Sequence, residues 1–464
     1  MSRTVAFLSA VVFAGGLWAG PVVARVEATS DHADCRYAAG ERSEVRFAVT
    51  DTNGVPLKAG RVTVKVDNFG TREMVPERTV DLANENPVKV VAGRETPGFL
   101  RITLTSADTN EIVIAGNGLW GRHLREFIWG QGFDVEKIVS GTPDVADFDA
   151  FWSNAVARLD ATVPVDARLE PLPSPDPAFR VYRISVATAQ DRRVWGWITE
   201  PCNLSKGPYP VHLEASGAGE GWTSAHPGIK GAIVCRMTVH TFEPPEGGGP
   251  EVSAERRRRY LAQVAKYATP NGVDDYYCAG IHRGREGYFY YAVILGLNRM
   301  VDWLAARPEC DASRMSYGSA SQGGGLGLAL TYLNRHISRT IVYVPAITDL
   351  LGFRAEAGRQ SGWPELVERQ RPENRATAEA NAPYFCGVNF ARRITKPIRF
   401  VVGYIDLTCP PNAGYAACNA CPSKDKSIAG GVAMGHRVSE PFSARGLAWE
   451  LWRRGDIRGG NDAK

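Results

Sequence analysis

The chain has 464 residues, of which 44% are hydrophobic and 22% are charged. This composition is typical of a globular protein and excludes wholesale disorder, and the length predicts two domains. The formal net charge of +4 is too small for this length to give the broad basic field that nucleic-acid binding needs. No nucleic-acid partner is therefore expected.

The first 24 residues have the pattern of an export signal. Arg3 supplies a positive start, an apolar stretch follows, and the small residues ending at Ala24 fit a cleavage site. A retained membrane anchor is the alternative, but the stretch is short for a bilayer span and is interrupted by Gly15, Gly16, Gly20 and Pro21. We expect a signal peptide over residues 1–24 and a secreted or periplasmic protein without membrane attachment after its removal.

Residues 25–135 have the pattern of an antiparallel β-sandwich. β-Branched residues alternate or cluster in the segments "SEVRFAVT", "RVTVKV", "NPVKVV" and "FLRITLTS". Turn residues separate these segments, as in "DTNGVPLKAG" and "VAGRETPG". Short strands with regular turns predict a domain that is immunoglobulin-like in the loose sense. No catalytic set of residues is visible in it, so we interpret it as a spacer or packing module, with a glycan-binding module as the alternative.

The pattern changes near Thr142, where strands and helices begin to alternate. "DVADFDAFWSNAVARL" and "GYFYYAVILGLNRMVDWLAARP" have apolar residues at helical spacing. "YPVHLEAS", "RTIVYVPAI" and "KPIRFVVGYID" are continuous apolar runs, which are typical of strands buried on both faces. The alternation predicts an α/β domain over residues 141–455, with a mostly parallel sheet covered on both sides. Its last helix is expected in "PFSARGLAWELWRR", and residues 456–464 are expected to form a flexible tail.

The stretch "SYGSASQGGG" lies between a predicted strand and a predicted helix. A serine on such a sharp turn projects its oxygen above the sheet edge, and its neighbours must be small because the turn is crowded. Centred on Ser321, the usual G-x-S-x-G pattern has Ser319 in place of its first glycine. Centring on Ser319 would place Tyr317 in the crowded turn, so Ser321 is the better nucleophile. A serine-glycine loop without chemistry is the alternative.

A catalytic serine needs a base, and the base needs an acid that fixes its tautomer. In this fold the chain order is serine, acid, histidine. His336 would be carried away on the helix that follows the serine, whereas His436 opens a glycine-flanked loop after a short strand. Asp406 follows the strand nearest to His436 and is favoured as the acid over Asp349. A surface histidine and a turn-forming aspartate are the alternative readings of His436 and Asp406.

An oxyanion hole needs two main-chain N–H groups that point at the charge developing on the substrate carbonyl. The residue after the nucleophile, Gln322, supplies one. The segment "HLEASGAGEGW" fits the second, with Ser216 or Gly217 as the donor, because glycine lets the backbone approach closely. A plain glycine-rich turn is the alternative reading of this segment.

Nine cysteines are present, so at least one thiol stays unpaired even in an exported protein where disulfides form. Cys418 and Cys421 form a CxxC with Cys409 nearby. A zinc site would need a fourth ligand at comparable spacing, and His436 is assigned to the triad. A local disulfide or buried thiols are therefore favoured over a metal site, and neither a metal nor an organic cofactor is expected.

From about Gly141 to Arg454 the chain resembles the acetyl xylan esterase and cephalosporin C deacetylase family, the seventh carbohydrate esterase family, within the α/β-hydrolase superfamily. The matching stretches are "DFDAFW", "GYFYYAVILGLNRMVDWLAARPECDASRM", "SQGGG", "PYFCGVNFARRITKPI" and "GYIDLTCPP". The resemblance implies that Ser321 is the nucleophile, Asp406 the acid and His436 the base. It also implies oxyanion donors at Gln322 and Ser216.

Several positions depart from the family pattern. The family's arginine–glycine–glutamine motif is missing, and "MTVHTFEPPEGGG" stands in its place. His436 is followed by Arg437 instead of glutamate, Ser216 replaces a tyrosine, Ser319 replaces the first glycine of the turn, and the sandwich is not part of the minimal family enzyme. These differences concern pocket shape, substrate and the family's hexameric assembly. His240, in the replaced segment, is interpreted as structural or solvent-facing, with a place in the pocket as the alternative.

Together these observations predict a secreted serine esterase that removes acetyl groups from acetylated xylan or a related oligosaccharide. A peptidase or another carboxylic-ester hydrolase of the same fold is the first alternative, because such sheets host many activities. A catalytically decayed glycan-binding protein is the second, and the departures from the family pattern motivate it. The expected partner is an acetylated carbohydrate, and a homo-oligomer is compatible with the resemblance.

Overall fold

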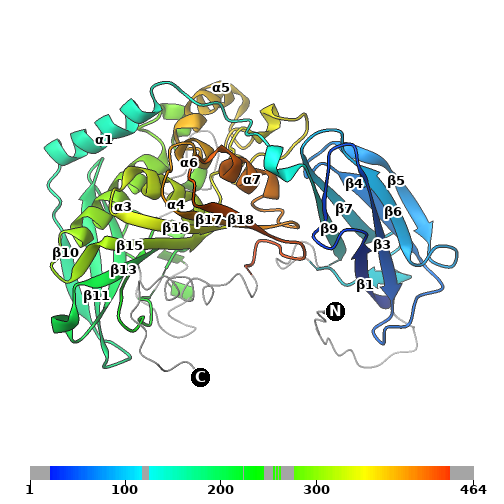
Figure 1. Cartoon of the computed structure of the whole chain (residues 1–464), viewed down its shortest axis with the longest axis horizontal. Helices are drawn as coiled ribbons and strands as arrows, with labels where there is room; N and C mark the ends of the chain where they lie inside the picture. Colours follow the sequence, from blue (N-terminus) through cyan, green and yellow to red (C-terminus); the bar gives the residue numbers. More distant parts are fainter. Residues whose placement is uncertain are drawn as a thin grey trace.

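The computed structural model describes residues 21–117, 125–222, 224–244 and 276–438, and between residues 245 and 275 only 254–255, 258–259 and 261–262. Figure 1 shows a β-sandwich beside a larger α/β domain, with β9 and α7 near their junction. The predicted helix over residues 441–454 and the predicted tail over 456–464 lie outside the described residues.

Within the described residues, the sandwich has one four-stranded sheet in the order β6–β3–β1–β8 and one five-stranded sheet in the order β2–β9–β7–β4–β5. Successive side chains of a strand face opposite sides of its sheet, so alternate residues such as Val45, Phe47 and Val49 enter the core. The strands are β1 (Val22–Ser30), β2 (Arg36–Tyr37), β3 (Arg42–Thr50), β4 (Arg61–Asp67), β5 (Glu73–Asp81), β6 (Val88–Gly93), β7 (Gly98–Ser106), β8 (Ile112–Ile114) and β9 (Glu126–Phe133).

The start of β1 bears on the predicted signal peptide. Val22–Ala24 pairs in parallel with Ile112–Ile114 of β8, and Ala24 is buried. Cleavage after Ala24 would therefore remove the residues of β1 that hold β8 in the sheet. Residues 1–20 lie outside the described part of the chain, so the signal peptide over 1–24 stays a prediction.

The α/β domain is built on a nine-stranded sheet in the order β10–β11–β12–β14–β13–β15–β16–β17–β18. The strands from β10 to β14 pair antiparallel, and those from β14 through β18 pair in parallel. The strands are β10 (Arg168–Leu172), β11 (Phe179–Thr188), β12 (Arg192–Pro201), β13 (Tyr209–Ala215), β14 (Ile233–Met237), β15 (Cys310–Ala320), β16 (Ile337–Tyr343), β17 (Ile398–Gly403) and β18 (Lys426–Gly431).

Figure 1 shows the labelled helices of this domain gathered on one side of the sheet, with α4 over β15 and β16. Among the described residues, no helix combines the length and the hydropathy needed to cross a membrane. The α-helices are α1 (Phe148–Thr162), α3 (Phe289–Ala305), α4 (Gln322–Leu333), α5 (Pro372–Asn381), α6 (Gly387–Ala391) and α7 (Pro411–Ala420). The 3-10 helices are η1 (Val135–Lys137), η2 (Leu204–Lys206), η4 (Tyr276–Cys278), η5 (Ile281–Arg283), η6 (Gly352–Arg354) and η7 (Ala382–Tyr384).

The predicted fold class, a mostly parallel α/β domain behind a β-sandwich, is confirmed. The labelled helices cover one face of the sheet, so cover on both faces stays a prediction. The four strands that the sequence indicated in the sandwich correspond to β3, β4, β6 and β7. The sequence pattern missed β5, an edge strand whose residues are mostly exposed, because no alternation of apolar and polar residues marks such a strand.

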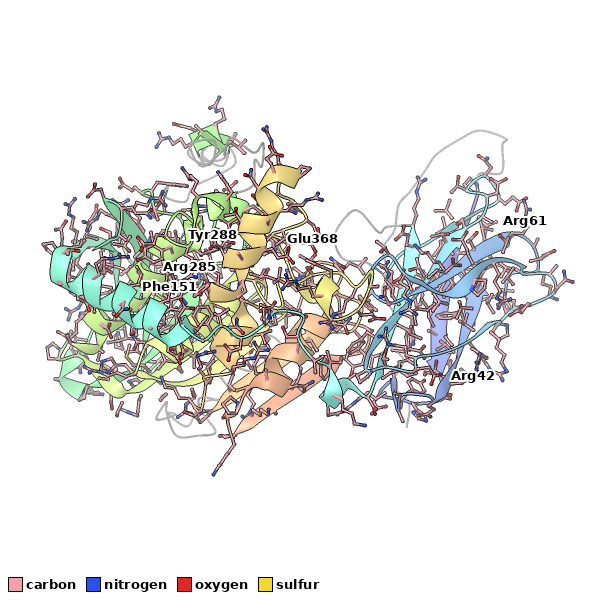
Figure 2. All side chains as sticks on the ribbon, turned by 90° about the horizontal axis from the view of Figure 1, so that it is seen from above. Arg42, Arg61, Phe151, Arg285, Tyr288 and Glu368 are labelled. Atoms are coloured by element: carbon pink, nitrogen blue, oxygen red, sulfur yellow. The ribbon has the colours of Figure 1, made fainter. Side chains whose placement is uncertain are left out.

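The sandwich has its own hydrophobic core, but part of it also packs into the core of the α/β domain, and Figure 2 shows the side chains of the two domains meeting at their junction. Phe69 and Phe99 belong to the sandwich by sequence, but both are fully buried in the core cluster of the α/β domain. The Phe99 ring lies 4.9 Å from the ring of Tyr404 and 5.5 Å from that of Tyr415. A sandwich that only served as a tethered spacer would not bury these aromatic side chains against the neighbouring domain. The two domains are therefore packed together.

A buried ion pair crosses the same junction. Arg94 of the sandwich donates to Glu356 of the α/β domain at 2.8 Å, and the Arg94 side chain is completely buried. Its guanidinium also donates to the carbonyl groups of Thr96 and Phe99. The charge of Arg94 is therefore compensated only while the sandwich stays docked.

We expect Glu356→Gln to lower the free energy of unfolding by about 3 kcal/mol, because it leaves the buried Arg94 charge without a counter-ion. The matched control is Glu85→Gln, which removes the exposed ion pair between Arg78 and Glu85 within the sandwich and should cost less than about 1 kcal/mol. Chemical denaturation measures both. Equal losses in the two variants would contradict a buried pair at the junction.

Candidate active site

Ser321 occupies a sharp turn between β15 and α4. Its backbone has φ 58° and ψ −126°, a region that residues other than glycine rarely adopt. β15 ends at Ala320 and α4 begins at Gln322, so the turn consists of the serine itself. This is the strained strand-to-helix turn that presents a nucleophile above a parallel sheet, not a flexible serine-glycine loop.

The glycines after Ser321 are required by close backbone contacts. A Cβ atom at Gly323 would lie 2.2 Å from the carbonyl oxygen of Ala215, and one at Gly325 would lie 2.0 Å from that of Ala346. Ser319, at the position of the usual first glycine, is buried and accepts the Ala215 N–H at 2.9 Å. Its hydroxyl therefore attaches the turn to β13, so Ser319 has a structural role beside Ser321.

The structure brings the three predicted triad side chains together. The Nε2 atom of His436 lies 2.9 Å from Oγ of Ser321, and its Nδ1 atom lies 2.9 Å from Oδ2 of Asp406. Asp406 is completely buried, whereas the His436 side chain keeps 13% of its surface exposed. A hydroxyl, an imidazole and a carboxylate thus form a continuous hydrogen-bonded path that is buried at Asp406 and partly exposed at His436 and Ser321.

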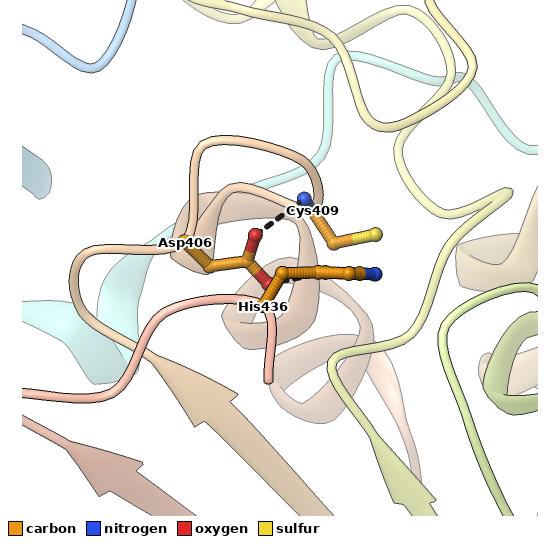
Figure 3. Close-up of side chains that lie close together, drawn as sticks. All are labelled: Asp406, Cys409 and His436. Carbon is orange, nitrogen blue, oxygen red and sulfur yellow. Dashed lines mark hydrogen bonds and ion pairs between the residues drawn. The ribbon is translucent and has the colours of Figure 1, made fainter. Parts of the chain in front are cut away.

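The loop after β17 fixes the Asp406 carboxylate. Its Oδ1 atom accepts the N–H groups of Thr408 at 2.8 Å and Cys409 at 2.9 Å, and Oδ2 remains for His436. Figure 3 shows the Cys409 side chain beside the imidazole, and Asp406, Cys409 and His436 have potential metal-ligand atoms within 4.8 Å of one another. Burial raises the pKa of the Cys409 thiol well above its usual range, so Cys409 is a neutral thiol beside the triad.

The rival residues are held elsewhere. Asp349 is buried, pairs with Arg359, and accepts from the Ser140 hydroxyl at 2.6 Å and the Gly141 N–H at 2.9 Å. It therefore fixes the segment between the two domains. Nε2 of His336 lies 3.9 Å from Oδ1 of Asp302. The preference for Asp406 over Asp349 and for His436 over His336 agrees with this geometry.

The structure corrects one predicted oxyanion donor. The Ser216 N–H donates to the Met237 carbonyl at 3.0 Å and continues the ladder between β13 and β14, so it is not free to bind an oxyanion. The next N–H, of Gly217, has no acceptor within the described residues. The Gln322 N–H, at the first position of α4, has no intrahelical partner. The candidate donors are therefore Gln322 and Gly217, which the sequence analysis gave as the alternative to Ser216.

The Gln322 side chain clamps the candidate oxyanion loop, a role that the sequence reading missed. Its Nε2 atom donates to the carbonyl groups of Ser216 at 3.3 Å and Gly217 at 3.1 Å. Its Oε1 atom accepts the hydroxyls of Tyr276 at 2.8 Å and Tyr290 at 2.5 Å. A trans peptide directs its N–H opposite to its C=O, so the bond to the Ser216 carbonyl turns the Gly217 N–H away from this buried clamp.

An ion pair supports the same loop from β13 and β14. Arg236 donates to Glu214 at 2.8 Å, and its guanidinium lies 4.2 Å from the ring centre of Trp222. Burial alone would raise the pKa of Glu214, but His212 and Arg236 lower it to about 2. Glu214 is therefore ionised and bound in the folded protein, two residues before the candidate oxyanion loop.

His240 follows β14 and contacts the same loop. Its Nε2 atom lies 2.7 Å from the Gly219 carbonyl, and its ring stacks on Phe242 and meets the edge of Tyr276. Burial lowers the pKa of His240 to about 4, so its ring is neutral at neutral pH. His240 is buried, so the structural interpretation fits its surroundings and the solvent-facing one is wrong.

All nine cysteines lie among the described residues, and none forms a disulfide. The local disulfide suggested for Cys418 and Cys421 is absent, and the alternative of buried thiols is confirmed for both residues. Cys421 instead directs its Sγ to the Ile394 carbonyl.

Comparison with known proteins agrees with this geometry. The family model described as acetyl xylan esterase (AXE1) matches residues 134–450. The chain belongs to the acetyl xylan esterase family. As a member it is a carboxylic-ester hydrolase of the acetyl esterase type, and the resemblance seen in the sequence is confirmed.

One curated relative of this acetyl xylan esterase family member aligns with most of the chain. Acetyl esterase Axe7A of Xylanibacter ruminicola is 28% identical over 414 residues, which cover 86% of this chain and 84% of the relative. That share exceeds the part of the chain after residue 133, so the alignment extends into the sandwich.

Two solved structures show the fold of the α/β domain. Acetyl xylan esterase 1 of Thermoanaerobacterium sp. JW/SL YS485 has 20% identity and a TM-score of 0.53, covering 68% of this chain and 96% of that one. Acetyl xylan esterase of Paenibacillus sp. R4 has 22% identity and a TM-score of 0.51, covering 69% and 97%. At this level of identity the likeness concerns the fold.

Substituting each of the two buried aspartates tests which one acts on His436. Asp406→Asn should keep the bonds to the Thr408 and Cys409 N–H groups but lose the correct tautomer of His436, so kcat for ester hydrolysis should fall by about 10⁴-fold. Asp349→Asn, the matched control, should lower the unfolding midpoint and keep kcat within about tenfold. A larger loss of kcat in Asp349→Asn than in Asp406→Asn would overturn the assignment.

The pKa of Glu214 predicts a pH-dependent stability. Because this pKa is about 2 in the folded protein and about 4.5 when unfolded, Glu214 stabilises the fold above pH 4.5, and this contribution is lost as the pH falls toward 2. The stability gap between wild type and Glu214→Gln should therefore narrow over this range by roughly 3 kcal/mol. Urea denaturation at a series of pH values measures it, and a constant gap would contradict the assignment.

Proposed function

We propose that this protein is a secreted serine esterase that removes acetyl groups from acetylated xylan or related oligosaccharides through an acyl-enzyme. The observation that carries the proposal is the path from Ser321 through His436 to Asp406, with 2.9 Å at each step. Membership of the acetyl xylan esterase family and the likeness to an acetyl esterase support the choice of an acetyl ester as the substrate.

Ser321 attacks the ester carbonyl while Nε2 of His436 takes its proton. Asp406 keeps the Nδ1–H of His436 directed at its carboxylate and stabilises the imidazolium that forms. The N–H groups of Gln322 and Gly217 bind the developing oxyanion. His436 then gives the proton to the leaving sugar oxygen, and the acetyl group remains on Ser321.

Deacylation uses the same groups in reverse order. His436 takes a proton from water, the hydroxide equivalent attacks the acetyl carbonyl, and the Ser321 oxygen leaves with the proton returned by His436. Acetate is the product. In each step one proton moves between His436 and Ser321, the sugar oxygen or water, while Asp406 stays ionised.

Export is supported by the residues before β1. The apolar segment after Arg3 and the small residues up to Ala24 fit a leader, and a polysaccharide substrate would be met outside the cytoplasm. Because Val22–Ala24 contributes to β1, a cleavage point shortly before Val22 would preserve the sandwich better than one after Ala24.

Acetate release from acetylated xylan by wild type and by Ser321→Ala tests the function directly. Wild type should release acetate, and Ser321→Ala should lose roughly 10⁶-fold in kcat because the nucleophile is gone. A fluorophosphonate probe should label wild type and leave Ser321→Ala unlabelled. Thermal unfolding of both proteins serves as the control for folding.

The outcomes separate the alternatives. Cleavage of peptide anilides in place of acetylated xylan would favour a peptidase of the same fold. Absence of fluorophosphonate labelling in folded wild type, together with retained binding of xylan, would favour a glycan-binding protein that has lost catalysis.

A further inference from the structure

The loop that carries Asp406, residues 404–409, contacts two other parts of the molecule. The first is the segment that leads to His436: the Tyr404 N–H donates to the Gly431 carbonyl at 3.0 Å, and the Ile405 N–H donates to the Met434 carbonyl at 3.2 Å. These bonds attach the acid loop to the base loop. The sandwich makes a second set of contacts with this loop, and the proposed function assigns the sandwich no role.

One contact between the sandwich and this loop joins two main chains. Gly130, in β9 of the sandwich, approaches Tyr404 so closely that a Cβ atom would lie 2.0 Å from the Tyr404 carbonyl oxygen. On the neighbouring strand β7, the Phe99 ring packs against the rings of Tyr404 and Tyr415. The end of β17 that leads into Asp406 is therefore in direct contact with the sandwich.

A second connection reaches the acid loop through residues 356–360. The Gln360 N–H donates to the Phe69 carbonyl of the sandwich at 3.2 Å, and Nε2 of Gln360 donates to the Leu407 carbonyl at 3.2 Å. Leu407 directly follows Asp406. The Thr71 N–H donates to the Gly358 carbonyl at 2.8 Å, which fixes the same segment to the sandwich.

We propose that the sandwich positions the catalytic acid: Gly130 and Phe99, which contact Tyr404, and the Phe69–Gln360–Leu407 bridge together hold loop 404–409 so that Asp406 stays directed at His436. The inference rests on the proposed triad but assigns the sandwich a part in it. Gly130, Phe99 and Gln360 act through Asp406 and are positioning residues.

A glycan-binding role for the sandwich has less support on the described residues. The large hydrophobic side chains that it exposes there are aliphatic, namely Val22, Val23 and Val55. A sugar ring stacks on an aromatic face, and among these exposed side chains there is none. The aromatic rings Phe69 and Phe99 are instead committed to the junction.

Two matched pairs of full-length variants test the proposal. Gly130→Ala places a methyl group against the Tyr404 carbonyl, whereas Gly93→Ala places one 2.6 Å from the Glu41 carbonyl inside the sandwich. Phe99→Ala removes a ring from the junction, whereas Phe47→Ala removes an equally buried ring from the core of the sandwich, where it contacts Phe127. Each pair makes the same chemical change at and away from the acid loop.

The measurements are kcat and KM for para-nitrophenyl acetate, and the rate at which a fluorophosphonate labels Ser321, all well below the unfolding midpoint of each variant. We expect kcat and the labelling rate to fall about tenfold or more in Gly130→Ala and Phe99→Ala, with KM within about twofold of wild type. Gly93→Ala and Phe47→Ala should keep all three values within about twofold, although their unfolding midpoints fall.

Other outcomes would overturn the proposal. Equal kcat in the two members of both pairs would show that the sandwich contributes only stability. A raised KM for acetylated xylan with unchanged kinetics on para-nitrophenyl acetate would show that it binds glycan. The labelling rate reports the reactivity of Ser321 with no acetyl sugar present, so it separates failure of this inference from failure of the proposed substrate.

Discussion

Parallel pairing of the strands from β15 to β18 is the constraint on which the site depends. Ser321 follows β15, Asp406 comes three residues after β17, and His436 comes five residues after β18. Because neighbouring parallel strands end at the same edge of a sheet, residues far apart in the chain meet there. The register fixes how closely they meet, since Gly403 of β17 lies opposite Gly431 of β18. A shift of that register would move the acid away from the base.

The strain at Ser321 is offset by the packing around it. A non-glycine residue in such a conformation costs roughly 1–3 kcal/mol and persists only where its surroundings determine it. Here the Ser321 N–H donates to the Tyr343 carbonyl at 2.9 Å, and its carbonyl accepts the Ala346 N–H at 2.9 Å. The main chain of the nucleophile is therefore held on both sides, by the end of β16 and by the segment that follows it.

Much of the fold and the triad could be predicted because they rest on local patterns. The serine turn is marked by small residues between a strand and a helix, and the position of Asp406 after the strand nearest to His436 favours it over Asp349. The oxyanion donor could not be predicted to the residue, because whether the Ser216 N–H is free depends on the pairing of β13 with β14. The clamp by Gln322 was also hidden, since its hydroxyl donors come from Tyr276 and Tyr290, which are distant in sequence and look like ordinary core residues.

The junction with the sandwich affects the electrostatic environment of Asp406. A carboxylate without solvent contact is stable only if its oxygens are fully hydrogen-bonded, and Asp406 meets this requirement with two N–H groups and one imidazole. These donors come from loop 404–409 and the loop of His436, which have little regular secondary structure to hold them. The sandwich covers the end of β17 at this point and brings Phe99 and Gly130 against Tyr404. A domain that keeps water from the acid loop strengthens the interaction between Asp406 and His436, because charges interact more strongly where the dielectric constant is low.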